Sequence, residues 1–68
     1  MKLSARNQIK GTVTEVVKGA TSHVRIDIGN GVVITASITN AAVDELRLVV
    51  GKPAYAVVKA SNVMVGVD

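Results

Sequence analysis

Two short polar segments hold the residues best suited to bind a ligand. Arg6 stands two residues after Ser4, and Lys59 is followed directly by Ala60 and Ser61. A cation beside a hydroxyl group and backbone N–H groups can hold a small oxyanion. A tetrahedral dianion needs donors that converge from several directions, and one short loop cannot supply them. We therefore expect the two clusters to meet, across a boundary between subunits.

The remaining residues that could act as an acid, a base or a nucleophile do not form a catalytic set. A nucleophile needs an activating base within hydrogen-bond reach. His23 is the only histidine and shares one strand face with Arg25 and Asp27, so we interpret it as an exposed strand residue. Asp44 and Glu45 are adjacent on a short helix and point in different directions. The pattern predicts no enzyme activity.

Composition argues against two further classes of site. The chain has no Cys and one His, which excludes thiolate ligands, so we expect no bound metal cation. Nucleic-acid-binding barrels stack bases on aromatic side chains, and Tyr55 is the only aromatic residue here. The net charge is +3, and the basic residues are scattered along the chain. Nucleic-acid binding therefore remains an alternative without strong support.

The length of 68 residues predicts one domain, residues 1–68, with a marginal core. Apolar residues make up 49% of the chain, and no disulfide can form without Cys. We infer that much of this apolar surface is buried between subunits. No apolar h-region follows Lys2 and Leu3, and no apolar run is long enough for a membrane span. We expect a free-standing, soluble, cytoplasmic protein.

Alternating hydrophobicity predicts five strands, at residues 9–18, 23–28, 32–38, 54–59 and 62–67. In the first strand Val13 and Val17 are expected on one face, and a bulge or bend is expected near Glu15 and Val16. Residues 29–31, Gly-Asn-Gly, predict a hairpin turn.

A short helix is expected between the third and fourth strands. Thr39 and Asn40 are both possible N-caps for a helix at residues 41–46, with Val43 and Leu46 packing inward. Three strands, a helical connection and two more strands predict an all-β fold. We expect a five-stranded OB-like Greek-key barrel with one short helix.

Three segments of the chain closely resemble the molbindins. They are Ser-Ala-Arg-Asn-Gln-Ile-Lys-Gly at residues 4–11, Ile-Thr-Asn at 38–40 and Tyr-Ala-Val-Val-Lys-Ala-Ser-Asn-Val-Met-Val-Gly at 55–66. Molbindins are small bacterial molybdate-binding proteins built from a single Mop domain of the TOBE type. The same domain occurs in molybdate-responsive regulators and in the ATPase subunits of molybdate importers.

The resemblance implies an OB-like barrel that assembles into a homo-hexamer, a trimer of dimers, with oxyanions at the subunit interfaces. By that resemblance Ser4 and Arg6 come from one subunit. Lys59, Ala60 (through its backbone N–H) and Ser61 come from a neighbour. The cations balance the charge of the dianion, while hydroxyl and N–H groups fix its orientation.

The family also has a second kind of anion site near the symmetry axis. In this chain it is expected at the turn formed by Gly19, Ala20, Thr21 and Ser22. The family often carries an Asn-Ser pair in this turn and is slightly longer there.

Two functions follow as hypotheses. In the first, the chain binds and stores molybdate or tungstate for molybdenum homeostasis, without an organic cofactor. In the second, it is an OB-type interaction module, either nucleic-acid-binding or a fragment of a regulator. Molybdate, tungstate and sulfate are all tetrahedral dianions, so the sequence leaves the choice among them open.

Overall fold

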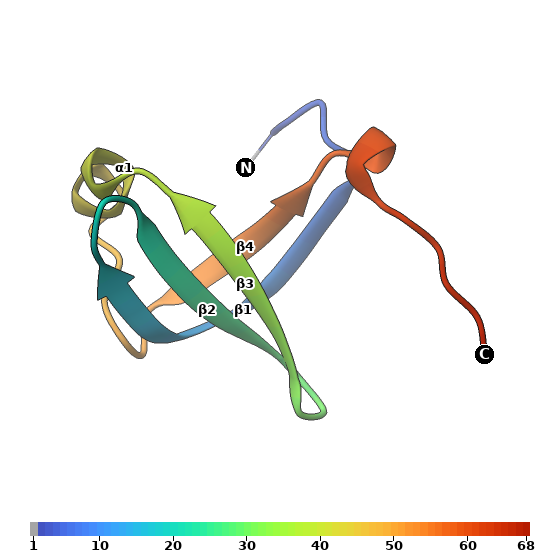
Figure 1. Cartoon of the computed structure of the whole chain (residues 1–68), viewed down its shortest axis with the longest axis horizontal. Helices are drawn as coiled ribbons and strands as arrows, with labels where there is room; N and C mark the ends of the chain where they lie inside the picture. The colour runs from blue at the N-terminus through green and yellow to red at the C-terminus, as the bar shows by residue number, and fades with distance from the viewer. Residues whose placement is uncertain (1) are drawn as a thin grey trace.

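The protein is a small, mostly-β domain, and its computed structural model describes residues 2–68 (Figure 1). Its elements follow one another as β1 (Asn7–Lys18), β2 (Ser22–Gly29), β3 (Val32–Ile38), α1 (Asn40–Glu45), β4 (Pro53–Val58) and the 3₁₀ turn η1 (Ala60–Asn62). The four strands form one antiparallel sheet in the order β3-β2-β1-β4. The sheet is open, with β3 and β4 as its edges.

The core lies on the concave face of this strongly coiled sheet. The buried apolar residues come from β1, β2, β4 and α1. They are Val13, Val24, Ile26, Ala56 and, from the helix, Val43. Alternate residues of the strands point inward because successive side chains of a strand point to opposite faces. Partly buried side chains of β3, among them Ile34 and Ile38, pack against this cluster.

A β-bulge in β1 changes which side chains face the core. The register with β2 shifts between Val13 and Glu15, which confirms the expected irregularity near Glu15 and Val16. Because a bulge adds one residue to one strand, the alternation of faces restarts after it. Val16 packs against the core, whereas Val17 is 48% exposed. The prediction that Val17 shares the face of Val13 is therefore wrong.

Close packing of β1 on β2 depends on the absence of a side chain at Gly11. A Cβ atom at this position would lie 2.5 Å from the carbonyl oxygen of Asp27 and 2.7 Å from Cγ2 of Ile26. Both distances are shorter than real contacts allow. Glycine is thus required here for its size, whereas the β2–β3 hairpin needs Gly31 for its positive φ of 75°.

The helix α1 begins after Thr39, whose Oγ1 accepts a hydrogen bond of 3.0 Å from the Ala42 amide. Of the two N-caps considered, Thr39 is the one used. Val43 is buried as predicted, but Leu46 is 58% exposed, so its predicted inward position is wrong. The helix ends at Glu45, and Leu48, which donates its amide to the Val43 carbonyl, packs against the core instead.

The fifth strand predicted at residues 62–67 is not present in the described part of the chain. After β4 the chain makes η1 and continues as an extended tail that projects away from the sheet (Figure 1). Alternating valines in the tail satisfy the pattern of a strand, but a strand also needs a partner edge to supply its hydrogen bonds. Within residues 2–68, no helix is long and apolar enough to cross a membrane.

Candidate anion-binding site

Pairing of β1 with β4 brings the two polar clusters to the same end of the sheet. The antiparallel register begins with Asn7 opposite Val58. Arg6 directly precedes one of these residues, and Lys59 directly follows the other. Figure 1 shows the N-terminal lead-in and η1 side by side at this end. Within one chain the two clusters therefore lie at the same end of the β1–β4 pair, and the expectation that they meet across a subunit boundary stays a prediction.

Neutral side chains brace this end of the sheet. The Asn7 side-chain amide donates 3.2 Å to the Val58 carbonyl across the strand pair. The Gln8 side-chain amide donates 3.1 Å to the Ala5 carbonyl, which fixes the lead-in that carries Ser4 and Arg6. The sequence analysis did not assign these roles to Asn7 and Gln8. Both residues stand where the polar lead-in meets the first strand, and this position is the one feature of the sequence that could have indicated a structural role for them.

The turn η1 presents the second cluster. Its hydrogen bonds run from the Asn62 amide to the Lys59 carbonyl (2.8 Å) and from the Val63 amide to the Ala60 carbonyl (3.2 Å). The amides of Ala60 and Ser61 open the turn, and amides at a helical start have no acceptor within it. Two backbone donors that are not used within η1 therefore follow Lys59 directly in the chain.

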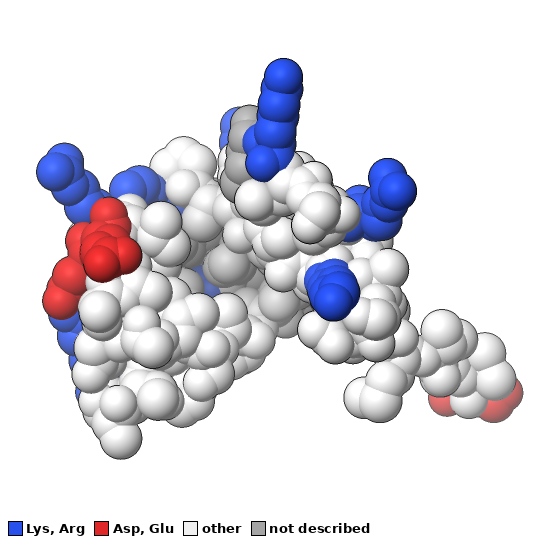
Figure 2. Space-filling view, turned by 90° about the horizontal axis from the view of Figure 1, so that it is seen from above, with Lys and Arg blue, Asp and Glu red and all other residues white. Residues whose placement is uncertain are grey.

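The site end of the chain is exposed and cationic. Ser4, Arg6, Lys59, Ala60 and Ser61 are all solvent-exposed. Among residues 2–68 the one ion pair joins Lys18 to Asp44, far from these groups in the fold. Within residues 2–68, neither Arg6 nor Lys59 forms an ion pair. Figure 2 shows basic side chains projecting at separate points, and acidic ones on the side where α1 lies and at the tip of the C-terminal tail.

The turn expected to form a second site differs from the first because its hydrogen-bonding groups are partly used within the fold. Gly19, Ala20 and Thr21 are exposed, and the Gly19 amide donates 2.9 Å to the Thr21 carbonyl. Ser22 is fully buried, and its hydroxyl donates to the side-chain oxygen of Asn40.

Asn40 completes the bracing of this turn. Its side-chain nitrogen donates 2.9 Å to the Gly19 carbonyl, so Asn40 ties the turn to the start of α1. The sequence analysis had considered Asn40 only as a helix cap. An anion at this turn would have to compete with Asn40 for the Ser22 hydroxyl. The Gly19–Ser22 turn lies at the opposite end of β1 from Arg6.

The described residues contain no group of three or more His, Cys, Asp or Glu side chains placed to hold a metal ion. What the arrangement offers is a set of hydrogen-bond donors and two cations at the β1–β4 end. Such a set suits a small anion with several oxygen atoms.

The family model and a relative of known name assign the chain to the same family. The TOBE domain matches residues 3–65. A probable molybdenum-pterin-binding protein of Haemophilus influenzae is 54% identical over the whole of both chains.

Solved structures agree with this comparison. MopII of Clostridium pasteurianum has a TM-score of 0.90 and 40% identity, covering 97% of this chain and 100% of that one. The cytoplasmic molybdate-binding protein ModG, solved with molybdate bound, has a TM-score of 0.91 and 42% identity. The match covers 100% of this chain and 49% of the ModG chain. The chain belongs to the TOBE domain family and, within it, to the small Mop-type proteins known as molbindins.

Proposed function

We propose that the protein binds molybdate, and tungstate as its larger analogue, and stores the anion in the cytoplasm for molybdenum homeostasis. The observation that supports this proposal is that Arg6 and Lys59 flank the Asn7–Val58 pair, so that both cations lie at the same end of the β1–β4 pair. The relatives support the choice of ligand, since ModG is a cytoplasmic molybdate-binding protein whose structure was solved with molybdate bound.

The proposed chemistry is binding without catalysis. Arg6 supplies a planar fork that can donate two hydrogen bonds to adjacent oxygens, and Lys59 supplies a compact charge. The hydroxyls of Ser4 and Ser61 and the amide of Ala60 then orient the anion. No metal cation and no organic cofactor take part.

Assembly is part of the proposal. One chain offers its donors from one side only, and all five residues are open to solvent. A tetrahedral dianion is held firmly only when donors surround it and exclude water. We therefore propose that a second copy closes each site, within a homo-hexamer built as a trimer of dimers. Ser4 and Arg6 of one copy then face Lys59, Ala60 and Ser61 of its neighbour.

Calorimetric titration tests the ligand and the site together. The protein is titrated with molybdate, tungstate and sulfate, and also with a pterin because the Haemophilus influenzae relative's name includes one. Arg6→Ala should weaken molybdate binding by about tenfold or more, because a hydrogen bond to a charged group contributes roughly 1.5–3 kcal/mol. Lys10→Ala is the matched control, since Lys10 is an exposed cation four residues further on, within β1. Equal affinities in the two variants would refute the site.

Complementation tests the sharing of sites between chains. Arg6→Ala and Lys59→Ala chains are unfolded, mixed and refolded together. If neighbours share a site, some sites in the mixed assemblies contain the intact half of two different chains and regain affinity. Binding that stays absent in properly assembled mixtures would mean that both cations of a site come from the same chain.

The alternative function is that of an OB-type interaction module, binding nucleic acid or serving in a regulator. Tyr55 is 47% exposed and is the one aromatic residue available for base stacking. Salt-dependent binding of a single-stranded oligonucleotide, together with no response to molybdate, would favour this function.

A further inference from the structure

Gln8 holds the peptide that leads into Arg6. Its side-chain amide donates 3.1 Å to the carbonyl of Ala5, and one planar peptide unit joins that carbonyl to the backbone amide of Arg6. Among the described residues, this is the one hydrogen bond that connects residues 2–6 to the sheet. The orientation in which the chain presents Ser4 and Arg6 therefore depends on Gln8.

Asn7 holds the corresponding peptide on the facing strand. Its side-chain amide donates 3.2 Å to the carbonyl of Val58, which shares a peptide unit with the backbone amide of Lys59. Val58 is the last residue of β4 and lies opposite Asn7 in the register. The bond therefore fixes β4 at the point where the chain leaves the sheet for Lys59. Two adjacent residues of β1 thus each hold the peptide that precedes a cation of the proposed site.

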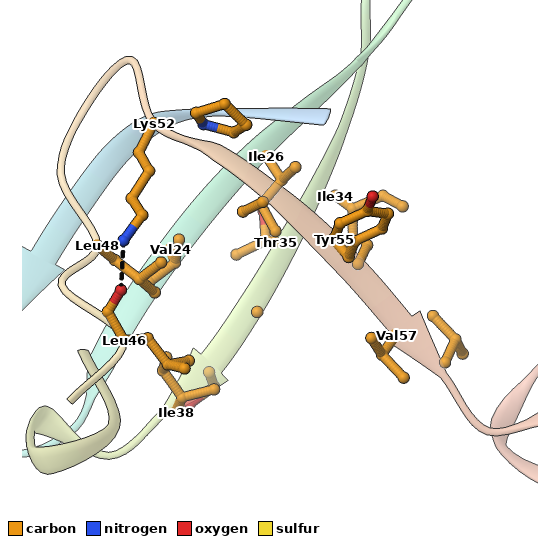
Figure 3. A pocket seen from close by; sticks show the side chains of 16 residues that line it. Val24, Ile26, Ile34, Thr35, Ile38, Leu46, Leu48, Lys52, Tyr55 and Val57 are labelled. Carbon is orange, nitrogen blue, oxygen red and sulfur yellow. Dashed lines mark hydrogen bonds between the residues drawn. The ribbon is translucent and has the colours of Figure 1, made fainter. Parts of the chain in front are cut away.

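A lysine elsewhere in the chain shows what happens when a cation supplies such a bond itself. A cleft of about 750 Å³ lies between β3 and β4, and Lys52 is the one charged residue in its lining (Figure 3). The Lys52 ammonium donates to the carbonyls of Leu46 (2.7 Å, Figure 3) and Arg47 (3.2 Å). Its charge is thus used within the fold.

At the β1–β4 end, neutral amides satisfy the carbonyls beside the cations. Within residues 2–68, neither the Arg6 nor the Lys59 side chain donates a hydrogen bond to the protein. Because Gln8 and Asn7 occupy the neighbouring carbonyls, these carbonyls do not draw the cations onto the backbone. The two amides therefore orient the cations and also leave their donors free for a ligand.

Neither bond is required to hold the sheet together. The Gln8 bond is exposed and spans three residues, so water competes with it and its contribution to folding is small. The Asn7 bond is partly buried, but it supplements a β1–β4 ladder of six residue pairs. The loss of either bond should therefore change the local geometry at the end of the ladder more than the free energy of unfolding.

We propose that Asn7 and Gln8 are positioning residues for the anion, with Gln8 acting through Arg6 and Asn7 through Lys59. This role rests on the proposed function and explains how the site is preorganised. Cations that are already oriented lose less conformational freedom when the anion binds. If the competent orientation is populated only in part, the apparent affinity falls by the same fraction.

Variants of similar size without a donor test this role by calorimetric titration with molybdate. Gln8→Met and Asn7→Leu should each weaken binding by about threefold to tenfold, the factor that corresponds to one neutral hydrogen bond. Thr14→Val is the matched control, because the Thr14 hydroxyl also donates from β1 to a backbone carbonyl, that of Arg25 (3.3 Å), which precedes no residue of the site. The control should stay within about twofold of the parent affinity. Parent affinity in both Gln8→Met and Asn7→Leu would overturn the proposal.

A shortened amide separates positioning from polarity at residue 8. Gln8→Asn keeps the amide group, but its side chain is one methylene shorter and does not span the contact with the Ala5 carbonyl. It should lose as much affinity as Gln8→Met. Full affinity in Gln8→Asn would contradict a positioning role for Gln8.

Double-mutant cycles identify the cation through which each amide acts. In an Arg6→Ala background, Gln8→Met should weaken binding by less than about twofold, while Asn7→Leu keeps its full effect. A Lys59→Ala background should give the reverse. General damage to the end of the sheet would not produce this crossed pattern, because it would affect both cations alike. Equal losses in the two backgrounds would overturn the assignment.

The free protein supplies a readout that needs no anion. Heteronuclear Overhauser effects of the backbone amides should fall at Arg6 in Gln8→Met and at Lys59 in Asn7→Leu. The thermal midpoint of Gln8→Met should shift by about 3 °C at most. A parent chain that binds none of the anions would refute the proposed function and the role that rests on it. Unchanged order at both cations, in a parent chain that binds molybdate, would refute the positioning role alone.

Discussion

The two ends of β1 carry similar residues but use them differently. At the start of the strand, small and hydroxyl-bearing residues flank Arg6 and Lys59, and Ser4, Ala60, Ser61 and both cations are exposed. At its end, the turn of Gly19, Ala20, Thr21 and Ser22 has the same small and hydroxyl-bearing composition. Its key hydroxyl, on Ser22, is fully buried and donates to Asn40.

The contrast shows that residue type alone does not identify a binding site. A hydroxyl can orient a ligand only if its hydrogen bond is not already committed within the fold. By this criterion we propose the β1–β4 end as the anion site, while the Ser22 hydroxyl and the Gly19 carbonyl connect the Gly19–Ser22 turn to Asn40 at the start of α1. Experiments that remove groups at each end can break or sharpen this distinction.

The largest effect is expected when both cations are removed from the β1–β4 end. Arg6→Ala combined with Lys59→Ala should weaken molybdate binding by at least about a hundredfold, since each charged hydrogen bond contributes roughly 1.5–3 kcal/mol. Unfolding of the free protein should change little, because both side chains are exposed. Calorimetry and thermal denaturation measure the two quantities. If the double variant binds molybdate with an affinity within about tenfold of that of the parent chain, the β1–β4 end is not the anion site and the proposed difference between the two ends is wrong.

Ligand-induced stabilisation is the next effect in size. Molybdate at a hundredfold excess over Kd should stabilise the native state by about 2.7 kcal/mol per site, because it binds only the folded protein. The thermal midpoint should rise with molybdate in the parent chain and in Ser22→Ala, but not when Arg6 and Lys59 are both replaced. A rise that is lost in Ser22→Ala alone would indicate that the second end also binds the anion.

Removing the Ser22 hydroxyl should instead affect folding. Ser22→Ala leaves the Asn40 side-chain oxygen without its donor in a partly buried position, at a cost of roughly 1–3 kcal/mol of unfolding free energy. Thr21→Ala is the matched control, since Thr21 is exposed in the same turn. Chemical denaturation measures both. If Thr21→Ala costs as much as Ser22→Ala, burial does not explain the role of this turn.

The smallest effect concerns the ion pair between Lys18 and Asp44, beside the same turn. Both side chains are largely exposed (49% and 67%), and such pairs contribute at most about 1 kcal/mol. Asp44→Asn should therefore lower stability by a few tenths of a kcal/mol, and 1 M salt should abolish the difference. Urea denaturation at low and high salt provides the measurement. A cost that persists in salt would mean that Asp44 holds α1 by more than charge.

Most of the sheet could be predicted from the sequence because alternation fixes which faces are buried. Residues 32–38 form β3 as expected, and β2 is one residue longer at each end. The predicted orientations of two side chains were wrong for local reasons. Val17 follows a bulge that shifts the alternation, and Leu46 lies just beyond the helix end. The prediction of a fifth strand was wrong because alternating hydrophobicity indicates that a segment can form a strand but does not identify the strand with which it would pair.

The candidate site was accessible from the sequence only in part. Arg6 and Lys59 could be selected because a cation followed or preceded by small hydroxyl residues is suited to an anion. Their placement at one end of the sheet depends on the pairing of β1 with β4, in which Asn7 lies opposite Val58, 51 residues further along the chain. The commitment of Ser22 to Asn40 likewise depends on the packing of α1, which no local pattern encodes.

The close approach at Gly11 has a consequence for how this sequence can diverge. Turn glycines such as Gly31 have open space around them, so Asn, which tolerates positive φ, is an available substitute. No residue is small enough to replace Gly11. Even alanine would push β1 from β2 at a point four residues from the Asn7–Val58 pair. Random mutagenesis with selection for anion binding should therefore tolerate change at the hairpin but recover only glycine at position 11, although Gly11 is not among the proposed anion-binding residues.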